Sequence, residues 1–320
     1  MPKISGSEAV IKCLINEGIE IIYGYPGGAI MPVYDELFKY QDKIHHVLTR
    51  HEQGATHAAQ GFARISGKVG VAIATSGPGA TNLVTGLADA QIDSTPMICI
   101  TGQVSSKLLG SDAFQETDMV GVSRPVVKHS FIVKHCSEIP LIIRKAFHIA
   151  TTGRPGPVVI DIPKDTTDPE ILETYEFPET VQMRSYNPVV EGNTKQIAKA
   201  VKQIFSSKKP IFYVGGGAVQ SDASEELKAI MAFLRAPITN TLMGLGAFPG
   251  TDKQCLGMLG MHGTYQANMA MHEADLIVAV GARFDDRVTN NPDKFCPEAK
   301  IIHIDIDPAS IAKIIDVDIP

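Results

Sequence analysis

The chain has 320 residues, of which 44% are hydrophobic and 20% are charged, and its formal net charge is -6. This length suits two α/β domains, the negative charge with scattered basic residues excludes a nucleic-acid partner, and five cysteines without a CxxC pair indicate core thiols in a reducing compartment rather than disulfides or a metal site. No apolar run approaches the roughly 20 residues of a membrane-spanning helix, and no secretion signal follows Met1, so we expect a soluble cytoplasmic protein without a membrane partner.

The first half of the chain alternates between short apolar runs and helix-length stretches. Ser5 and Glu8 have the spacing of a capping box at the start of a first helix, which ends at Gly18. Runs rich in β-branched residues predict strands at 21–24, 46–49, 69–75, 97–101 and 158–162, with helices such as 53–65 and 80–92 between them. This βαβα order predicts a mostly parallel sheet in a first domain, residues 1–165.

The composition changes between residues 166 and 193, where Thr, Pro, Glu and Tyr occur with little periodicity, and this favours an extended linker. The βα pattern then restarts, with strands expected at 211–214, 238–242, 276–280 and 301–306. We therefore expect a second domain, residues 194–320. The predicted fold class is α/β with two open, mostly parallel sheets.

Three strand-to-helix turns of the first domain carry residues suited to binding a ligand. Glu52 follows one strand, and glycine-containing turns at 25–28 and 76–82 follow two others. Ligands of open α/β sheets bind at the carboxyl ends of strands, and glycines there let the backbone approach a flat ligand closely. Taken alone, Glu52 suits a solvated acid that complements the helix dipole, and each glycine segment suits a tight turn. Three such turns around one carboxylate favour a pocket.

Six segments, taken in order, resemble those of acetohydroxyacid synthases, and the resemblance runs through essentially the whole chain. They are YPGGAIMP at 25–32, RHEQGA at 50–55, ATSGPGATN at 74–82, ITGQ at 100–103, DAFQE at 112–116 and GRPGP at 153–157. Related thiamine enzymes share the glutamate and the SGPG turn, but the full series is much narrower. It implies a pyrimidine-binding domain of a thiamine-diphosphate enzyme, followed by a Rossmann-like, FAD-binding central domain.

The resemblance also implies a role for each residue of the first site. Glu52 would bond a ring nitrogen of the thiamine pyrimidine and favour the tautomer that deprotonates the thiazolium, and losing such a group costs roughly 100-fold to 10,000-fold in rate. Phe114 and Gln115 would face the reacting centre. Lys164 would lie near the substrate entrance, although an exposed loop lysine explains it equally well. The residues expected to contact this cofactor are Tyr25, Pro26, Gly28, Glu52, Pro78, Asn82 and Gln115.

A second site is expected in the second domain. Gly215 and Gly217 have the GxG spacing of a dinucleotide turn, which is a weak signal by itself. An NAD site also needs an acid at the end of the following strand, but that strand ends in Thr-Asn-Thr at 239–241. The resemblance implies an extended FAD instead, held by Arg154, Gly215, Gly216, Thr241, Leu242, Met243, Met261, His262, Gly281, Arg283, Asp285, Arg287, Asp305 and Ile306.

Arg283 and Arg287 are the cations of this second site. They would offer charged forks to the flavin, its diphosphate or a carboxylate, and Arg287 would also touch the carboxylate of the second 2-oxo acid. Alternatively, both pair with Asp285 and Asp286 in a surface network. The RFDDR string at 283–287 is absent from the flavin-free catabolic acetolactate synthases, so the resemblance favours the biosynthetic enzyme, in which the flavin is largely structural.

The Gly-Asp-Gly tripeptide that holds Mg²⁺ and the diphosphate in thiamine enzymes does not occur, and the Asn-Asn pair at 290–291 lacks an acidic partner in the expected order. We therefore expect no metal ligand in this chain and expect the ligands of Mg²⁺ and the diphosphate in a further domain. The family's active site spans a subunit interface. A homodimer or higher oligomer is thus expected, with little or no activity of this chain alone.

The predicted reaction joins pyruvate to a second 2-oxo acid, pyruvate or 2-oxobutyrate, with thiamine diphosphate as cofactor. Its products are 2-acetolactate or 2-aceto-2-hydroxybutyrate, at the first common step of branched-chain amino-acid biosynthesis. A small regulatory subunit is a further candidate partner. Two alternatives stay open. One is another flavin-containing thiamine enzyme, such as pyruvate oxidase or glyoxylate carboligase, and the other is a non-catalytic FAD-binding module.

Overall fold

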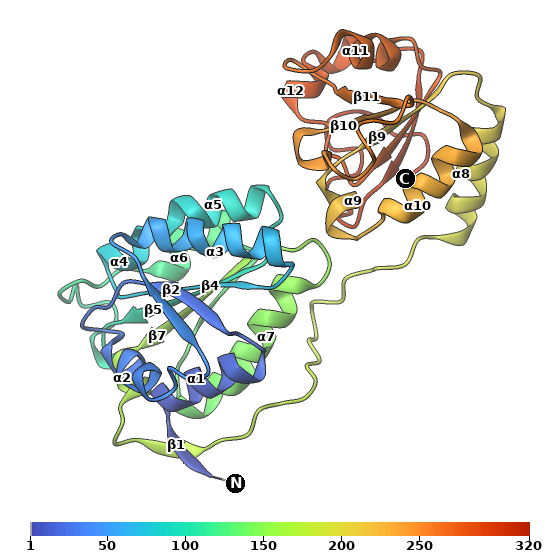
Figure 1. Ribbon diagram of the computed structural model, residues 1–320. Coiled ribbons are helices and arrows are strands. Elements are labelled where there is room, and N and C mark those ends of the chain that lie inside the picture. Colours follow the sequence, from blue (N-terminus) through green and yellow to red (C-terminus); the bar gives the residue numbers. More distant parts are fainter. Residues whose placement is uncertain (1) are drawn as a thin grey trace. The chain divides into compact units, whose positions relative to one another are not determined.

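The computed structural model describes residues 2–320, which form two compact units, a first that ends at Pro188 and a second from Val189 to Pro320. Figure 1 shows that each unit is a sheet with helices packed on both faces. The two open, parallel α/β sheets predicted from the βα pattern are thereby confirmed. Within residues 2–320, no helix combines the length and the apolar character that a membrane crossing needs.

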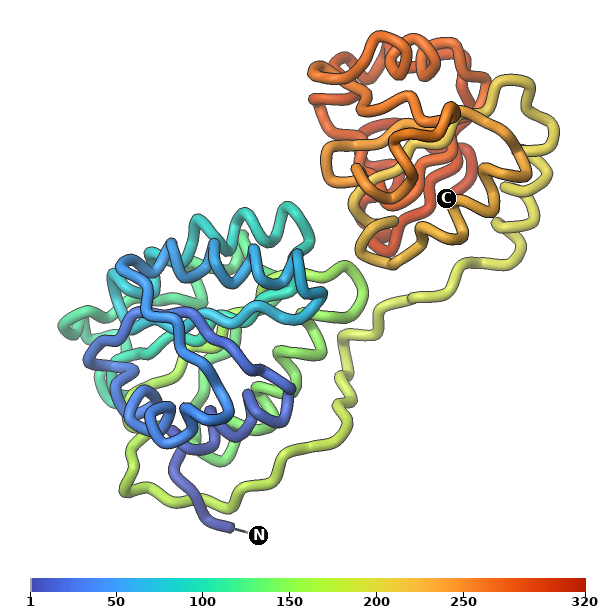
Figure 2. Tube along the Cα trace, viewed as in Figure 1, coloured from blue at the N-terminus to red at the C-terminus, as the bar shows by residue number. Residues whose placement is uncertain are grey.

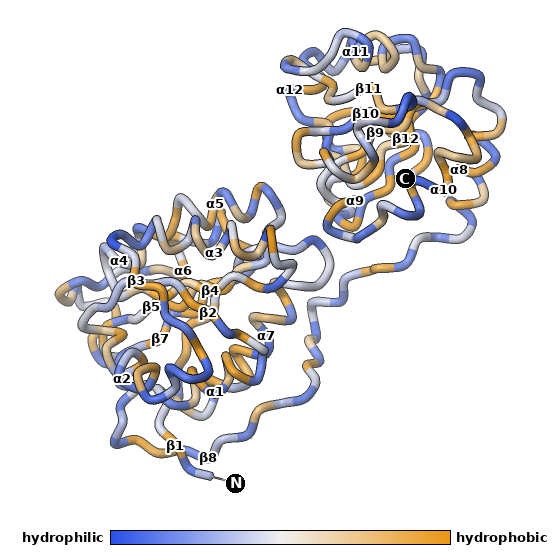
Figure 3. The backbone as a smooth tube through the Cα atoms, in the orientation of Figure 1, coloured by the Kyte–Doolittle hydropathy of each residue, from blue (hydrophilic) through white to orange (hydrophobic). Residues whose placement is uncertain are grey.

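Six parallel strands form the main sheet of the first unit, in the order β3-β2-β4-β5-β7-β6. Their bounds are β2 (Ile21–Gly24), β3 (His45–Leu48), β4 (Gly70–Ala74), β5 (Met97–Gln103), β6 (His129–Ile132) and β7 (Pro157–Pro163). The central strands β4, β5 and β7 are buried along their whole length, and Figure 3 shows apolar residues concentrated there. Because all strands run the same way, their carboxyl ends share one edge.

Helices cover both faces of this sheet (Figure 1). One core contains residues of α1 (Gly6–Asn16), α2 (Met31–Lys39) and α7 (Ile139–Thr151), and the other contains residues of α3 (Glu52–Ser66) and α5 (Val84–Ile92). Short helices complete the unit: α4 (Pro78–Thr81), α6 (Met119–Ser123), and 3₁₀ turns at Ser106–Leu108, Arg124–Val126, Cys136–Glu138 and Lys164–Thr167. The expected cap of the first helix is present, since the Ser5 hydroxyl accepts a hydrogen bond from the Glu8 amide.

The segment expected to be an extended linker has little regular structure, but most of it packs on the first unit. Its one strand, β8 (Leu172–Thr174), pairs antiparallel with β1 (Lys3–Ser5). Figure 2 shows this stretch running back past the N-terminal strand. The first unit therefore ends at Pro188 rather than near residue 165, and we call residues 168–188 the strap.

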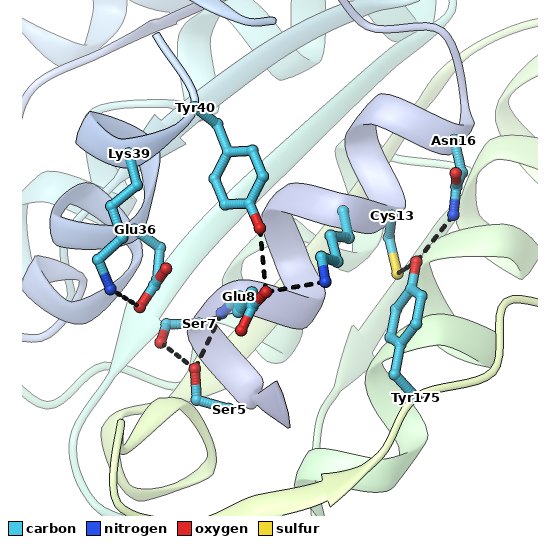
Figure 4. A network of polar contacts seen from close by, with 10 residues as sticks. Ser5, Ser7, Glu8, Cys13, Asn16, Glu36, Lys39, Tyr40 and Tyr175 are labelled. Carbon is cyan, nitrogen blue, oxygen red and sulfur yellow. Dashed lines mark hydrogen bonds and ion pairs between the residues drawn. The ribbon is translucent and has the colours of Figure 1, made fainter. Parts of the chain in front are cut away.

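Aromatic side chains hold the strap, which is the physical reason for the later boundary. The Tyr175 hydroxyl accepts a hydrogen bond from Asn16 Nδ2 at 2.8 Å and lies 3.8 Å from Cys13 Sγ; Figure 4 shows Tyr175 directed at these two residues of α1. The Tyr186 hydroxyl donates to the Thr152 carbonyl at 2.6 Å. Composition alone describes such a segment as a linker, whereas its tyrosines fix it to the helices.

Five parallel strands form the sheet of the second unit, in the order β11-β10-β9-β12-β13. They are β9 (Pro210–Val214), β10 (Ile238–Asn240), β11 (Cys255–Met258), β12 (Leu276–Val280) and β13 (Lys300–Ile304). The helices are α8 (Thr194–Ser206), α9 (Gly216–Gln220), α10 (Ser224–Leu234), α11 (Tyr265–His272) and α12 (Asp286–Thr289), with 3₁₀ turns at Leu242–Gly244 and Pro292–Lys294. β11 escaped sequence prediction because this edge strand is only half-buried and contains a glycine.

Candidate active site

The residues predicted for the first site lie at the carboxyl edge of the first sheet. Tyr25 follows β2, Glu52 follows β3, Pro78 follows β4, Gln115 follows β5 and Lys164 follows β7. These strands are consecutive neighbours in the sheet order. Parallel pairing thus brings segments that are far apart in the sequence to one edge, where ligands of open α/β sheets bind.

Glu52 is a buried carboxylate at this edge. It begins α3, whose N-cap is His51, and the His51 Nδ1 accepts a hydrogen bond from the Gln53 amide at 3.1 Å. Glu52 is only 8% exposed, and its Oε2 accepts a hydrogen bond from Asn82 Nδ2 at 2.9 Å. This burial excludes the alternative of a solvated acid that only complements the helix dipole.

Thr75 joins the two glycine turns beside that carboxylate. Its Oγ1 accepts a hydrogen bond from the Ala29 amide at 3.2 Å, and a Cβ on Gly27 would lie 2.5 Å from the Thr75 side chain. A Cβ on Gly79 would lie 2.7 Å from Thr75 Cγ2 and 3.3 Å from Glu52 Oε1. The backbone therefore closes around Thr75 and the carboxylate. Sequence reasoning missed Thr75, whose only signal was its place at a strand end before the SGPG turn.

Residues 104–118, which we call the β5 loop, reach the same turn from the other side. The Gln115 backbone rests on Gly77, because a Cβ there would lie 2.7 Å from Gln115 O and 2.9 Å from Gln115 Cα. Gly77 has φ +61°, a left-handed conformation that favours glycine. Phe114, next to Gln115, is 89% exposed. The turn at 77–79 thus touches the β5 loop at one end and Glu52 at the other.

Four of the predicted cofactor-contacting residues face open space or solvent. A Cβ on Gly28 would meet nothing within 4 Å, and Tyr25, Pro26 and Pro78 are exposed. Lys164 is an exposed residue at the start of the 3₁₀ turn after β7. Exposure suits both interpretations of Lys164, a loop lysine and a residue at the substrate entrance, so its contact with substrate stays a prediction.

Two half-buried residues, Tyr34 and His46, were missed by sequence reasoning. The rings of Tyr34 and His46 meet edge-on, with centroids 5.1 Å apart. The Tyr34 hydroxyl and His46 Nε2 are buried without a hydrogen-bond partner within the described part of the chain. Burial, with the Glu52 charge nearby, raises the pKa of Tyr34, and burial lowers the pKa of His46. Tyr34 lies within the apolar pattern of α2, where no sequence signal distinguishes it.

The glycines of the predicted dinucleotide turn pack against backbone. A Cβ on Gly215 would lie 2.2 Å from Gly281 O, and one on Gly217 would lie 2.8 Å from Gly281 Cα. The Gly217 amide also donates to Gly281 O at 3.0 Å. These two glycines therefore allow the loops after β9 and β12 to touch, which gives the GxG spacing a structural cause. Gly216 instead faces the Met243 side chain, and FAD contacts at Gly215 and Gly216 stay predictions.

Apolar side chains lie exposed at the carboxyl edge of the second sheet. All follow β10, β11 or β13, and they are Leu242, Met243, Met261 and Ile306. Thr241 accepts a hydrogen bond from the Gly244 amide, and Asp305 accepts one from the Asp307 amide, so both are fixed in their turns; His262 is exposed. Exposed apolar groups at a strand-end edge suit the flat faces of a dinucleotide.

Both arginines of the second site are exposed. Arg287 Nε lies 3.9 Å from Asp286 Oδ2, which is a long contact. Asp285 instead caps α12 by accepting a hydrogen bond from the Arg287 amide at 3.0 Å. The carboxylate of Asp285 is therefore used by the helix start, and the alternative of a four-residue surface network with Arg283 is reduced to one weak pair.

Comparisons with known proteins match both units. The N-terminal TPP (thiamine pyrophosphate) binding domain of the thiamine pyrophosphate enzymes matches residues 4–122, and the central domain of that family matches residues 197–320. The chain belongs to the thiamine pyrophosphate enzymes. All 320 residues align at 59% identity with the acetolactate synthase large subunit of Haemophilus influenzae, of which they cover 56%.

Two further relatives give the same picture. The acetolactate synthase isozyme 3 large subunit of Escherichia coli is 55% identical over 320 residues, with 56% of its length covered. The probable acetolactate synthase large subunit of Methanocaldococcus jannaschii is 55% identical over 318 residues, which are 99% of this chain and 54% of that relative. This thiamine pyrophosphate enzyme chain therefore spans about half the length of the curated relatives that it matches.

The residues of the first edge fit the aminopyrimidine of thiamine pyrophosphate. Glu52 offers a second oxygen, Oε1, that accepts no hydrogen bond from residues 2–320, and a buried carboxylate without a partner at that oxygen suits a ring N–H donor. Open space in front of Gly28 leaves room for a flat ring. Within residues 2–320, no group of three His, Cys, Asp or Glu side chains is arranged to hold a metal ion.

Arg154, predicted to contact FAD, is placed by the structure at the end of α5 in this thiamine pyrophosphate enzyme. Its Nε donates to Ser94 Oγ at 2.8 Å, and its Nη2 donates to the carbonyls of Gln91 and Ile92, each at 3.2 Å. A cation there stabilises the carbonyl end of a helix. Arg154 precedes β7 and so lies at the amino edge of the first sheet, opposite Glu52. Its flavin contact stays a prediction.

Proposed function

We propose that this chain contributes the pyrimidine-binding and central domains of a biosynthetic acetolactate synthase. The reaction joins pyruvate to pyruvate or 2-oxobutyrate and gives 2-acetolactate or 2-aceto-2-hydroxybutyrate. Its support is the similarity to acetolactate synthase large subunits at 55% to 59% identity. The observation that carries the proposal is the buried Glu52 carboxylate, which Asn82 orients at a carboxyl edge where Gly28 faces open space.

Thiamine diphosphate, when bound, supplies the electron sink that accepts the charge left when a 2-oxo acid loses its carboxylate. The chain's own residues bind and orient. Asn82 holds Oε2 of Glu52 at 2.9 Å, which leaves Oε1 to share a proton with a pyrimidine ring nitrogen. The buried environment strengthens that interaction, because little water competes for the carboxylate. Gln115 and Phe114, carried by the β5 loop beside Gly77, would face the reacting carbon.

Cationic side chains provide the attraction for the carboxylates of the 2-oxo acids. Lys164 is exposed at the same edge as Glu52, and Arg287 is exposed at the carboxyl edge of the second sheet. Both cations suit small acids with one carboxylate. FAD is proposed as a largely structural cofactor of the second unit, supported by the exposed apolar side chains and Arg283 at that edge.

Partners and further ligands belong to the same proposal. Relatives named large subunits imply a smaller companion, so we include a regulatory subunit along with a homodimer or higher oligomer. Mg²⁺ and the diphosphate are expected to bind residues outside this chain's sequence. The cytoplasmic location expected from the sequence stays a prediction.

The test uses the chain alone and the chain mixed with the remaining segment of the Haemophilus influenzae relative, with pyruvate, thiamine diphosphate, Mg²⁺ and FAD present. We expect acetolactate from the mixture, little or none from the chain alone, and a loss of roughly 100-fold or more with Glu52→Gln. Flavin reduction by pyruvate at a stoichiometric rate would favour an oxidase. A mixture that retains FAD yet gives no product, with Glu52→Gln behaving as wild type, would leave only a flavin-binding module.

A further inference from the structure

The β5 loop is held in a conformation that its sequence does not favour. Gln115 has φ +58° and Asp112 has φ +56°. Left-handed backbone is uncommon for residues other than glycine and persists where surrounding contacts over-determine it. Gln115 is also the residue whose backbone rests on Gly77. Other contacts must therefore hold the loop in this conformation. Three side-chain carboxylates accept hydrogen bonds in or next to the loop.

The first carboxylate, Glu116, lies within the loop, and the second, Asp165, binds the start of the loop. Glu116 Oε2 accepts a hydrogen bond from the Ala113 amide at 3.0 Å, and Oε1 accepts one from the Gly110 amide. The Ser106 amide donates to Asp165 Oδ1 at 2.8 Å. The contacts to Gly110 and Ser106 are exposed and the contact to Ala113 is only partly buried, so water competes with them. They shape the loop, but they do not fix its base to the sheet.

The third carboxylate, Asp161, is buried at the base of the loop. Gln103, the last residue of β5, is 2% exposed, and Asp161 on the neighbouring β7 is 1% exposed. Gln103 Nε2 donates to Asp161 Oδ2 at 2.9 Å and to the Thr117 carbonyl at 2.6 Å, while Gln103 Oε1 accepts from the Val104 amide at 2.8 Å. Thr101 Oγ1 donates to Asp161 Oδ1 at 2.6 Å. One amide thus ties the first and the penultimate residue of the loop together.

The hydrogen-bond directions leave Asp161 one role. The Val104 amide can only donate and the Thr117 carbonyl can only accept, so they fix which end of the Gln103 amide is oxygen. Its remaining N–H must then find an acceptor, and Asp161 Oδ2 is that acceptor. The bond between Thr101 and Oδ1 can form whether or not Asp161 is protonated. The threonine hydroxyl donates to the carboxylate and accepts from the protonated acid. The bond to Gln103 therefore survives in both states of the acid.

Burying a carboxyl group at this position costs free energy, which its role as hydrogen-bond acceptor for Gln103 would explain. No cation of the described chain pairs with Asp161; the one charged group that acts on its titration is the Asp118 carboxylate, of like sign, and burial raises the pKa of Asp161 to about 6. Burial of a carboxyl without a cation is costly. The groups that face it across β5 are the neutral Thr101 and Gln103. Packing alone would be served better by an apolar side chain.

We propose that Asp161 and Gln103 form a buried clamp that closes the base of the β5 loop and so positions Gln115 against the turn beside Glu52. Asp161 is a positioning residue, since it touches neither cofactor nor substrate and acts through Gln103. The final step, from loop to thiamine site, rests on the proposed function. The clamp itself does not.

Two nearly isosteric substitutions separate the clamp from simple packing. Asp161→Asn keeps an acceptor for Gln103 and a donor for Thr101, whereas Asp161→Leu keeps the volume and removes both. Hydrogen exchange of the 320-residue chain, read at residues 105–116, should speed up roughly tenfold or more in Asp161→Leu, because a charged hydrogen bond is lost. It should return close to wild type in Asp161→Asn. Gln103→Glu, which places a second carboxylate against Asp161 and Thr117, gives the same reading should the leucine variant not fold.

The second arm is binding of thiamine, titrated by ligand-observed NMR with the same variants. Weaker binding in Asp161→Leu, by roughly fivefold or more, and recovery in Asp161→Asn support the positioning role. Exchange in the loop that is unchanged by Asp161→Leu and Gln103→Glu overturns the clamp. Faster exchange with unchanged thiamine binding overturns the positioning role. A wild-type chain that binds no thiamine contradicts the proposed function, and the exchange arm then decides the clamp by itself.

Discussion

Replacing Asp161 by Asn should remove a pH-dependent loss of stability. Burial raises the pKa of Asp161 from 3.8 to about 6, and the nearby Asp118 charge adds to this effect. The folded state therefore holds the proton more tightly than the unfolded chain does. The contribution of Asp161 to stability is most favourable at low pH, falls as pH rises from about 4 to about 6, and stays lower above that range.

The magnitude follows from the size of the shift. A rise from 3.8 to about 6 is about 2 units, and at 1.36 kcal/mol per unit this gives about 3 kcal/mol. Asn at this position does not titrate but still accepts from Gln103. The free energy of unfolding of Asp161→Asn, relative to wild type, should therefore improve by up to about 3 kcal/mol between pH 4 and pH 7.5.

Urea unfolding at pH 4, 6 and 7.5 measures this difference. Hydrogen exchange at the strands of the first unit separates its unfolding from that of the second unit. Asp165→Asn is the matched control. Burial pushes the pKa of Asp165 upward, but hydrogen bonds from Ser106 outweigh it and the pKa is lowered. The free energy of unfolding of Asp165→Asn should be lower than that of wild type at neutral pH, and the difference should shrink toward low pH. Parallel pH profiles of wild type and Asp161→Asn would refute the reasoning.

Three further substitutions test separate parts of the structure. Gly77→Ala should destabilise the first unit by more than about 1 kcal/mol, because it places a Cβ at φ +61° within 3 Å of the Gln115 backbone; thermal unfolding measures this. Tyr175→Phe removes the hydrogen bond from Asn16 and should cost about 1 kcal/mol, seen as earlier proteolysis of the strap. Arg283→Ala should weaken FAD retention by roughly tenfold or more, read from flavin absorbance after gel filtration.

Each of these has a control of similar chemistry. Gly28→Ala, whose Cβ would meet nothing within 4 Å, should leave thermal unfolding nearly unchanged, so equal losses at both glycines would contradict the strain argument. Tyr265→Phe removes an exposed hydroxyl and should not change the strap. Lys253→Ala lies before β11, at the amino edge of the second sheet. FAD retention that falls equally in both cation variants would indicate general electrostatics rather than a site.

The sequence by itself determined the parts of this protein that depend on local pattern. Alternating apolar runs and helix-length stretches specify parallel sheets, because each run must be buried on both faces. Strand-end position placed Glu52 and the turns at 25–28 and 76–82 on one edge without any coordinates. The ordered series of motifs then identified the family. Edge strands β6 and β11 were not predicted, since a serine in β6 and a glycine in β11 interrupt their short apolar runs.

Only the tertiary structure decided which side chains meet. The bond from Asn82 to Glu52 joins residues 30 apart, and that from Gln103 to Asp161 joins residues 58 apart. Neither pair has a spacing that a sequence can reveal, because partners across strands depend on sheet order and register. The strap is similar, since its tyrosines act only where α1 and α7 present acceptors and donors. Local pattern fixes what each segment becomes, and packing fixes which polar atoms it can satisfy.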